Sequence, residues 1–302
     1  MVDQRIVSFL KVYEKKNFTK ASSELALTQP AVSKHIRSLE DELGVLLFYR
    51  KSGTLEPTRE GRTVAKYARR KMSLDHNMRK EIRNMQNLVT SLSVGITHTA
   101  ESNASTEALA NYATAHEHLK LKIISDSTDR LISMIKDYKL DMAIIESRVN
   151  DSALKSVTLD TDSLVLAVAP NHPLAGKPSV TIDDIRKEKL IIRSRHSGTR
   201  SMFVSSLEAK DIHLSDFNIL MEIDNIAAIK DLIRQGFGVS VLARSACEDE
   251  WRKGKIALLP IENLSMIREM NLVDLKDYEH ENTIRDIISS YRETRNMITG
   301  KH

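Results

Sequence analysis

Apolar side chains recur at helical spacing from residue 6 to residue 13 and predict a first helix that opens at about Asp3. After a polar break the pattern restarts, and Thr19 is placed to cap a short second helix. Ala21 and Ser22 on that helix are small, which allows another helix to cross it closely. This arrangement is typical of a tight helix-turn-helix.

A third helix is predicted to follow a two-residue break and to begin after Thr28, a suitable N-cap, with Pro30 in its first turn. Its apolar positions step by four, three and four residues and are expected to face inward: Val32, Ile36, Leu39 and Leu43. The opposite face is polar and holds Gln29, Ser33, Lys34 and Arg37. This polar stripe is therefore free to touch another molecule.

The chemistry of the polar stripe suits the major groove of DNA. Glutamine can form two hydrogen bonds to an adenine edge, lysine reaches guanine acceptors or phosphate, and serine serves either. An ordinary solvated helix face is equally polar, so the stripe alone is a weak signal. The small-residue helix and the short turn before it favour DNA binding.

A two-stranded hairpin and a long helix are predicted next. Residues 43–58 combine an apolar run, a turn and a second extended segment, and Arg50 lies near the tip, where the duplex attracts fixed positive charge. Thr58 is expected to cap a helix from Arg59 to about Leu88, on the order of 45 Å long. Its loose apolar heptad favours a partner helix as cover; packing against its own downstream domain is the alternative.

A dense set of residues runs through FTKASSELALTQPAVSKHIRSLEDELGVLLFYR and continues in LEPTREG. It resembles the N-terminal winged helix-turn-helix of LysR-type transcriptional regulators, which implies a DNA-binding domain over 1–58 and a linker and dimerisation helix over 59–89. The expected DNA-contacting residues, with Arg37 added from the same polar stripe, are Gln29, Pro30, Ser33, Lys34, Arg37 and Arg50. Many members carry arginine at the position of Lys34. Lysine replaces the planar guanidinium fork of arginine by a point charge.

Beyond Val89, short β-branched runs alternate with helical stretches. The runs are Leu92–Ile96, Leu121–Ile124, Met142–Ile145, Leu164–Val168, Leu190–Ile192 and Val239–Leu242. Such alternation predicts an α/β domain with mainly parallel sheets, which bind ligands at the carboxyl ends of their strands. Hydroxyl and charged groups follow several of these runs, Glu146 among them, so we expect the ends to converge on one cleft.

The segment RSRHSGTR, residues 193–200, opens a predicted helix with hydroxyls, free backbone donors and arginines. This combination indicates an anion site, and a capped turn whose arginines face solvent is the alternative. Gly236 and Gly238 follow a helix, so we interpret them as C-cap and close-packing residues rather than phosphate binders.

The segments LDMAIIE, AVAPNHPLAG, SGTR and QGFGVSVL resemble the C-terminal half of the same family, which is similar to a type 2 periplasmic binding protein. The resemblance implies an effector-binding domain over 90–302. Subdomain I is expected at about 90–163 and 268–302, and subdomain II at about 164–267, with an effector between them. The expected effector-binding residues, including two arginines assigned from their loop, are Thr97, Thr99, Thr128, Arg195, Ser197, Thr199, Arg200 and Asn225.

The distribution of charge supports this division. Residues 1–90 hold 18 Lys and Arg against 10 Asp and Glu, whereas the remainder holds 27 against 31. A basic head on a mildly acidic body indicates a nucleic-acid-binding module attached to a second module. A single cysteine, Cys247, allows no intramolecular disulfide and no cysteine-based zinc site. With no apolar stretch typical of a secretory signal or membrane span, a cytoplasmic location is expected.

These patterns predict a sequence-specific transcriptional regulator, a homodimer or homotetramer, that binds double-stranded promoter DNA and is controlled by a small anionic metabolite. No catalytic residue, metal ligand, cofactor or membrane contact is expected. Two alternatives stay open: a small-molecule-binding or enzymatic α/β protein, and a DNA-binding protein without sequence preference. An enzyme needs a convergent nucleophile, base and stabiliser, and no spacing in the sequence suggests one.

Overall fold

The computed structural model describes residues 3–51, 54–85, 91–276 and 281–299. The chain divides into two compact units, one of residues 1–90 with 136–139 and the other of residues 91–135 with 140–302. Each unit has hydrophobic core clusters of its own.

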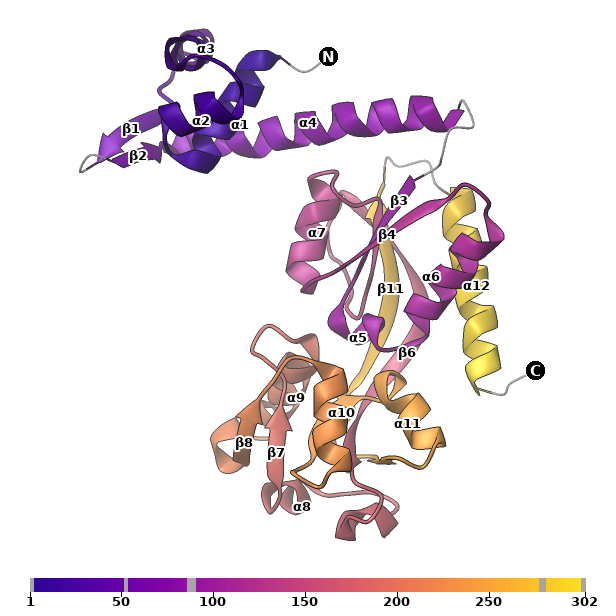
Figure 1. The fold of residues 1–302 in the computed structure, drawn as a ribbon. Coiled ribbons are helices and arrows are strands. Elements are labelled where there is room, and N and C mark those ends of the chain that lie inside the picture. The colour runs from indigo at the N-terminus through magenta and orange to yellow at the C-terminus, as the bar shows by residue number, and fades with distance from the viewer. Residues whose placement is uncertain (1–2, 52–53, 86–90, 277–280, 300–302) are drawn as a thin grey trace. The chain divides into compact units, whose positions relative to one another are not determined.

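The N-terminal unit combines three short helices, a hairpin and a long helix (Figure 1). Its elements are α1 (Gln4–Lys15), α2 (Phe18–Glu24), α3 (Gln29–Leu43), β1 (Phe48–Lys51), β2 (Thr54–Pro57) and α4 (Arg59–Met85). Phe9, Val12 and Val32 are fully buried in its core, and the rings of Phe9 and Phe48 lie 5.4 Å apart, joining α1 to the hairpin. The predicted winged helix-turn-helix is confirmed, while the expected end of the long helix near Leu88 lies outside the described residues.

The helix starts follow the predicted caps with one exception. Asp3 accepts a hydrogen bond from the Arg5 backbone N–H at 2.8 Å, and Thr28 caps α3 as predicted. The prediction that Thr19 caps the second helix is wrong, because α2 begins at Phe18 and the Asn17 side chain accepts from its backbone. Asparagine is at least as good an N-cap as threonine, so the earlier residue takes this position.

The turn and the end of α3 also differ from the prediction. The break between α2 and α3 spans four residues, Leu25–Thr28, rather than two, and Ala26 adopts a left-handed conformation with φ of 52°. Leu43 was expected in the core but is 46% exposed. It is the last residue of α3, and Gly44 with φ of 66° turns the chain before this side chain can reach the core.

Hydrogen bonds between side chains and backbone groups attach the segment before the hairpin to α3 and α4. The Glu40 carboxylate accepts from the Leu47 backbone N–H at 2.7 Å, and the Thr58 hydroxyl donates to the Leu46 carbonyl at 2.7 Å. Thr58 also caps α4 as predicted, because its hydroxyl oxygen accepts from the Gly61 N–H at 2.8 Å. At Gly61 an added Cβ would lie 2.1 Å from the Leu47 carbonyl oxygen.

Gly61→Ala is therefore expected to destabilise the N-terminal unit by about 1 to 3 kcal/mol, because the clash is with backbone that cannot rotate away. Hydrogen exchange of the α1 and α3 amides measures the loss. The control is Gly176→Ala, since a Cβ at Gly176 meets nothing within 4 Å. Equal protection in the two variants would contradict a close contact between α4 and the Leu47 backbone.

The C-terminal unit is built on a seven-stranded sheet of order β10-β6-β11-β5-β3-β4, with β9 paired to β6, and a separate pair β7-β8. The strands are β3 (Ser91–Ile96), β4 (Lys120–Ser125), β5 (Met142–Ile145), β6 (Leu154–Val168), β7 (Lys189–Ile192), β8 (Asn218–Glu222), β9 (Ser240–Ala243), β10 (Ala257–Leu259) and β11 (Ile267–Leu275). The prediction of mainly parallel sheets is wrong. The long strands β6 and β11 pair antiparallel with each other and with their neighbours, so the large sheet is mixed.

Helices cover two successive lobes, with β6 and β11 running from one to the other (Figure 1). The first lobe carries α5 (His98–Glu101), α6 (Ala104–Ala115), α7 (Thr128–Lys136) and α12 (Glu281–Thr299). The second carries α8 (Ile182–Arg186), α9 (Gly198–Glu208), α10 (Ile226–Arg234) and α11 (Glu248–Arg252), with short 3-10 turns at Pro173–Gly176, Leu214–Asp216 and Ser245–Cys247. Separate buried clusters, one containing Leu109 and Leu272 and the other Leu166 and Phe203, fill the two lobes.

Two glycines and the cysteine behave as simple structural residues. Gly236 has φ of 78° just after α10, and a Cβ on Gly238 would lie 2.4 Å from the Lys189 carbonyl oxygen. The interpretation as C-cap and close-packing residues is confirmed. Cys247 is fully buried, and burial raises the pKa of its thiol to about 12, so this side chain is unreactive in the folded protein.

Candidate functional site

The polar face of α3 is held in place from behind. Val32, Ile36 and Leu39 are buried, which turns the opposite side of the helix outward. His35 Nδ1 lies 2.8 Å from the hydroxyl of buried Ser8 on α1. Arg5 adds a second link from α1, with hydrogen bonds to Ser38 at 3.1 Å and to Glu42 at 2.6 Å. The helix is therefore fixed against rotation about its axis.

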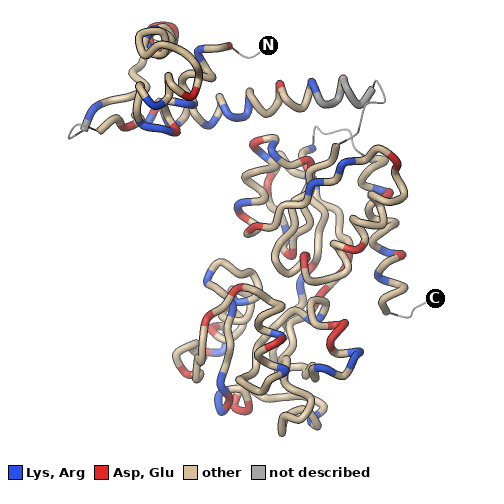
Figure 2. The backbone as a smooth tube through the Cα atoms, viewed as in Figure 1, with Lys and Arg blue, Asp and Glu red and all other residues tan. Residues whose placement is uncertain are grey.

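All six predicted DNA-contacting residues lie on the N-terminal unit with accessible side chains. Gln29, Pro30, Lys34 and Arg37 are exposed on α3, Ser33 is half-buried between them, and Arg50 is exposed on β1. The α3 residues line one shallow hollow together with Ser38 and Asp41. Figure 2 shows further lysines and arginines along α4. A convex helix with exposed amide, hydroxyl and cationic groups can hydrogen-bond base edges and phosphates.

A cavity of about 380 Å³ lies in the C-terminal unit where the carboxyl ends of β3, β4 and β5 face the β7–α9 loop. Its lining residues are Thr97, His98, Thr99, Asp126, Ser127, Thr128, Asp129, Glu146, Ser147, Arg193, Arg195, His196, Ser197, Gly198, Ser201 and Arg268. The size and the many polar side chains fit a small, polar organic molecule or an oxyanion. The start of α9, an eleven-residue helix, adds unpaired backbone N–H groups at this wall.

Five of the eight predicted effector-binding residues line the cavity: Thr97, Thr99, Thr128, Arg195 and Ser197. The structure places the other three elsewhere. Thr199 is buried and accepts a hydrogen bond from Arg268 at 3.4 Å, and Asn225 caps α10 through the Ala228 N–H. Arg200 is bonded to the Arg193 carbonyl and to Glu222 at 2.5 Å, so its guanidinium is already occupied.

Five charged residues of the cavity were not selected from the sequence: Asp126, Asp129, Glu146, Arg193 and Arg268. Glu146 was noted only as a charge after a strand, and Arg193 as the start of the anion segment. Arg268 lies on β11, opposite Asp162 on β6, and only the pairing of these two strands brings it beneath the cavity. The sequence contains no local signal for that register.

The charges around the cavity are unevenly balanced. Arg193 is neutralised by Asp224 at 2.7 Å, whereas Arg268 is nearly inaccessible and lies 3.5 Å from Asp162. The Thr97 hydroxyl donates to Glu146 Oε2 at 2.6 Å, and Glu146 Oε1 is buried without a hydrogen-bond partner among the described residues. Burial raises the pKa of Glu146, with the charge of Arg268 acting in the opposite direction.

Glu146→Gln is expected to become more stable relative to the wild type as pH rises. The folded protein favours the protonated carboxyl, so ionisation costs stability from the ordinary pKa of 4.5 up to the raised value and no further. Urea unfolding of both proteins across this pH range measures the difference. Exposed Glu208, at the end of α9 and outside the cavity, provides the matched control Glu208→Gln. A difference for Glu146→Gln that falls with pH would mean that its carboxylate is stabilised, not penalised.

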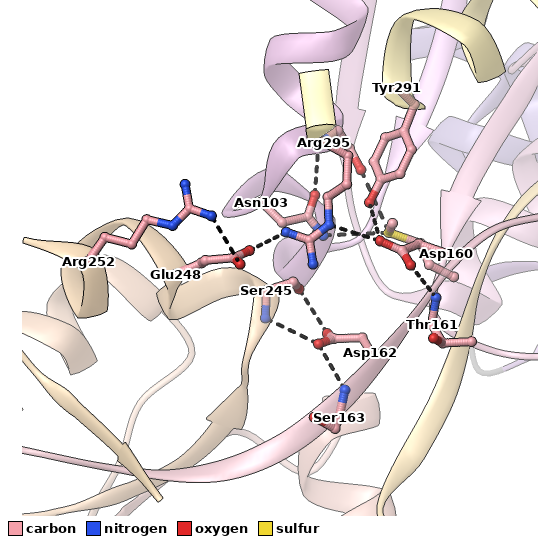
Figure 3. Close-up of polar contacts among 12 residues, drawn as sticks. Asn103, Asp160, Thr161, Asp162, Ser163, Ser245, Glu248, Arg252, Tyr291 and Arg295 are labelled. Carbon is pink, nitrogen blue, oxygen red and sulfur yellow. Dashed lines mark hydrogen bonds and ion pairs between the residues drawn. The ribbon is translucent and has the colours of Figure 1, made fainter. Parts of the chain in front are cut away.

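A second set of polar contacts connects the two lobes through β6 (Figure 3). Arg295 on α12 bonds Asp160 on β6 at 2.9 Å and contacts Glu248 on α11. Asp162 on β6 accepts from the Ser245 hydroxyl at 2.8 Å and from its backbone N–H at 3.1 Å. These polar contacts join α12, the crossover strand and the second lobe.

Other kinds of site are not seen in the part of the chain that the structure describes. Its His, Cys, Asp and Glu side chains form no group of three or more able to hold a metal ion. Among the same residues no helix combines the length and apolarity needed to cross a membrane.

Two sequence families match the chain. The LysR substrate binding domain covers residues 86–296, and the bacterial regulatory helix-turn-helix protein, lysR family, covers residues 4–62. The HTH-type transcriptional regulator CysL of Bacillus subtilis is 27% identical over 267 residues, 88% of each chain. The HTH-type transcriptional regulator CfxR of Cupriavidus necator is 27% identical over 269 residues, 87% of this chain and 84% of its own.

A solved structure supports the fold over the full length. The crystal structure of full-length CbnR complexed with its target DNA covers 96% of this chain and 99% of its own, with a TM-score of 0.69 at 18% identity. With both halves matched by their families, the chain belongs to the LysR family of DNA-binding transcriptional regulators, with an N-terminal helix-turn-helix and a C-terminal effector-binding domain.

Proposed function

We propose that this regulator reads a specific promoter sequence with the exposed face of α3 and is controlled by a small anionic metabolite bound in the cavity beside the β7–α9 loop. The observation that carries the first part is the outward, anchored polar face of α3, with Arg50 exposed on the adjacent hairpin. We assign DNA binding to residues 1–58, the linker helix to 59–89 and effector binding to 90–302.

The anionic character of the effector is supported by the wall that the β7–α9 loop supplies. Arg195 is exposed there and forms no ion pair within the described part of the chain. The first turn of α9 directs backbone N–H groups and the positive end of the helix dipole to the same wall. Arg268 lies beneath, braced by Thr199. An oxyanion or carboxylate would find hydrogen-bond donors and positive charge together.

Control of DNA binding requires two recognition helices held at a defined spacing, so we propose a dimer or tetramer. Tyr67, Leu74 and Ile82 on α4 are 59%, 52% and 50% exposed, which suits a helix covered by a second copy. A ligand that prefers one arrangement of the two lobes would shift the population of subunit packings, whereas equal affinity for both would switch nothing.

A thermal-shift screen tests the effector site. Sulfate, phosphate, nitrate and small carboxylates are added to the full chain, and a true ligand at about 100 times its Kd stabilises the folded state by about 2.7 kcal/mol. Arg195→Ala should abolish the rise in Tm, while Arg234→Ala, whose arginine on α10 is paired with Asp231, should keep it. A full rise in Arg195→Ala would move the site elsewhere.

A further inference from the structure

The acidic and basic residues that line the cavity lie on different segments of the chain. Carboxylates lie only on the side formed by the ends of β4 and β5: Asp126, Asp129 and Glu146. Arg193 and Arg195 lie on the opposite loop, whereas Arg268 lies on β11, the neighbour of β5 in the sheet. A cavity lined by both acidic and basic groups is complementary to a molecule that itself carries both charges.

Glu146 is the one of these three carboxylates that needs a partner. Asp126 accepts from the Ser127 N–H at 2.8 Å and from Arg130 at 3.0 Å. Asp129 is exposed, so water and salt screen it. Glu146 forms no ion pair within the described part of the chain, and its Oε1 is buried without a donor. A buried carboxylate oxygen without a donor is costly, and a bound ammonium group would satisfy it.

The arginines of the cavity retain hydrogen-bond donors that an anion could use. Arg193 is paired with Asp224 at 2.7 Å and Arg268 with Asp162 at 3.5 Å. Arg195 forms no ion pair within the described residues, and Arg268 Nε and Nη2 have no hydrogen-bond acceptor there. A simple anion would satisfy these donors and leave Glu146 unpaired, with a second negative charge brought near it. A simple amine would pair with Glu146 and leave the arginine donors without an acceptor. Only a ligand with both an anionic group and an ammonium group would pair the arginine donors and the Glu146 carboxylate at the same time.

We propose that the effector is a zwitterion of the α-amino acid class, with its carboxylate at Arg195, Arg268 and the start of α9 and its ammonium group at Glu146. The inference rests on the proposed effector site and narrows the ligand from an anion to an amino acid. A cavity of about 380 Å³ has room for a small or medium-sized amino acid.

Calorimetric titration of the full chain tests this with matched probes. Each of the twenty amino acids is compared with the 2-hydroxy acid that has the same side chain and with the amine that lacks the carboxylate. We expect at least one amino acid to bind 100-fold or more tightly than both of its partners. This comparison needs no variant, so it stands whether or not a substitution at Glu146 folds.

The variant Glu146→Gln makes the test specific. It should weaken amino acid binding by 30-fold or more and leave binding of the hydroxy acid unchanged or tighter, because a repelling charge is lost. General damage to the cavity would instead weaken the binding of both the amino acid and the hydroxy acid. Glu208→Gln, outside the cavity, should change neither.

Three results would overturn the proposal, and each points to a different description of the site. Equal binding of amino and hydroxy acids, unaffected by Glu146→Gln, would leave an anion site without ammonium recognition. Hydroxy acid binding that strengthens at low pH only in the wild type would mean that neutral Glu146, facing Thr97, Arg268 and Asp162, donates to an anion. If neither the probes nor inorganic oxyanions bind, the anion site itself is refuted.

Discussion

Replacing Gln29 by alanine is expected to weaken binding to the preferred DNA sequence by about 1 to 3 kcal/mol, and Lys34→Ala should do the same. Both side chains are exposed on the anchored face of α3, where a glutamine can hydrogen-bond adenine and a lysine guanine. Affinity for random DNA should change little with Gln29→Ala, since nonspecific binding comes from phosphate contacts. Fluorescence anisotropy with a duplex selected from a random pool, and with its scrambled form, measures both affinities.

The control for this pair is Lys253→Ala, which removes an exposed lysine of the C-terminal unit that is paired with Asp249. It should leave both affinities unchanged. Equal losses on the selected and the scrambled duplex in Gln29→Ala and Lys34→Ala would reject base recognition by α3.

Arg268→Ala is expected to destabilise the C-terminal unit by about 3 to 5 kcal/mol and to remove its response to an anionic ligand. Arg268 is 6% exposed and lies 3.5 Å from Asp162, which is itself buried. Its loss leaves a buried carboxylate without a compensating charge, and it also removes the opposing charge that keeps the pKa of Glu146 from rising further. Urea unfolding followed by the fluorescence of Trp251 measures the loss.

A second substitution separates charge from packing in this prediction. Asp162→Asn keeps the Oδ1 oxygen that accepts from both the Ser163 and the Ser245 backbone N–H but removes the stranded charge. Arg268→Ala with Asp162→Asn should therefore be more stable than the sum of the single losses predicts. Arg234→Ala is the matched control and should cost little. Strict additivity of the two losses would show that the ion pair carries no coupling.

The sequence was most informative in the N-terminal unit, because its signals are local. Caps such as Asp3 and Thr28, the step pattern of α3 and the turn between two extended runs each specify structure within a few residues. The errors there are local too: Asn17 caps α2 ahead of Thr19, and Leu43 lies beyond the core because α3 ends at it.

The cavity was predicted only in part, because its residues depend on contacts distant in sequence. The hydroxyls at strand ends were found, since their position follows from the local pattern. Arg200 carries the right chemistry but is bonded to Glu222 on β8, a strand that the sequence did not reveal. Arg268 reaches the cavity through the antiparallel pairing of β11 with β6. The pattern of apolar and polar residues does not predict this pairing.

The most direct test of the account is selection of the full chain on a pool of random duplexes at physiological salt. Reading of bases by α3 predicts convergence on one sequence, bound about 10³-fold or more above random DNA, and loss of that preference in Gln29→Ala. A pool that stays random, with the same affinity and salt dependence for every duplex, would contradict it and leave a protein that binds DNA without sequence preference.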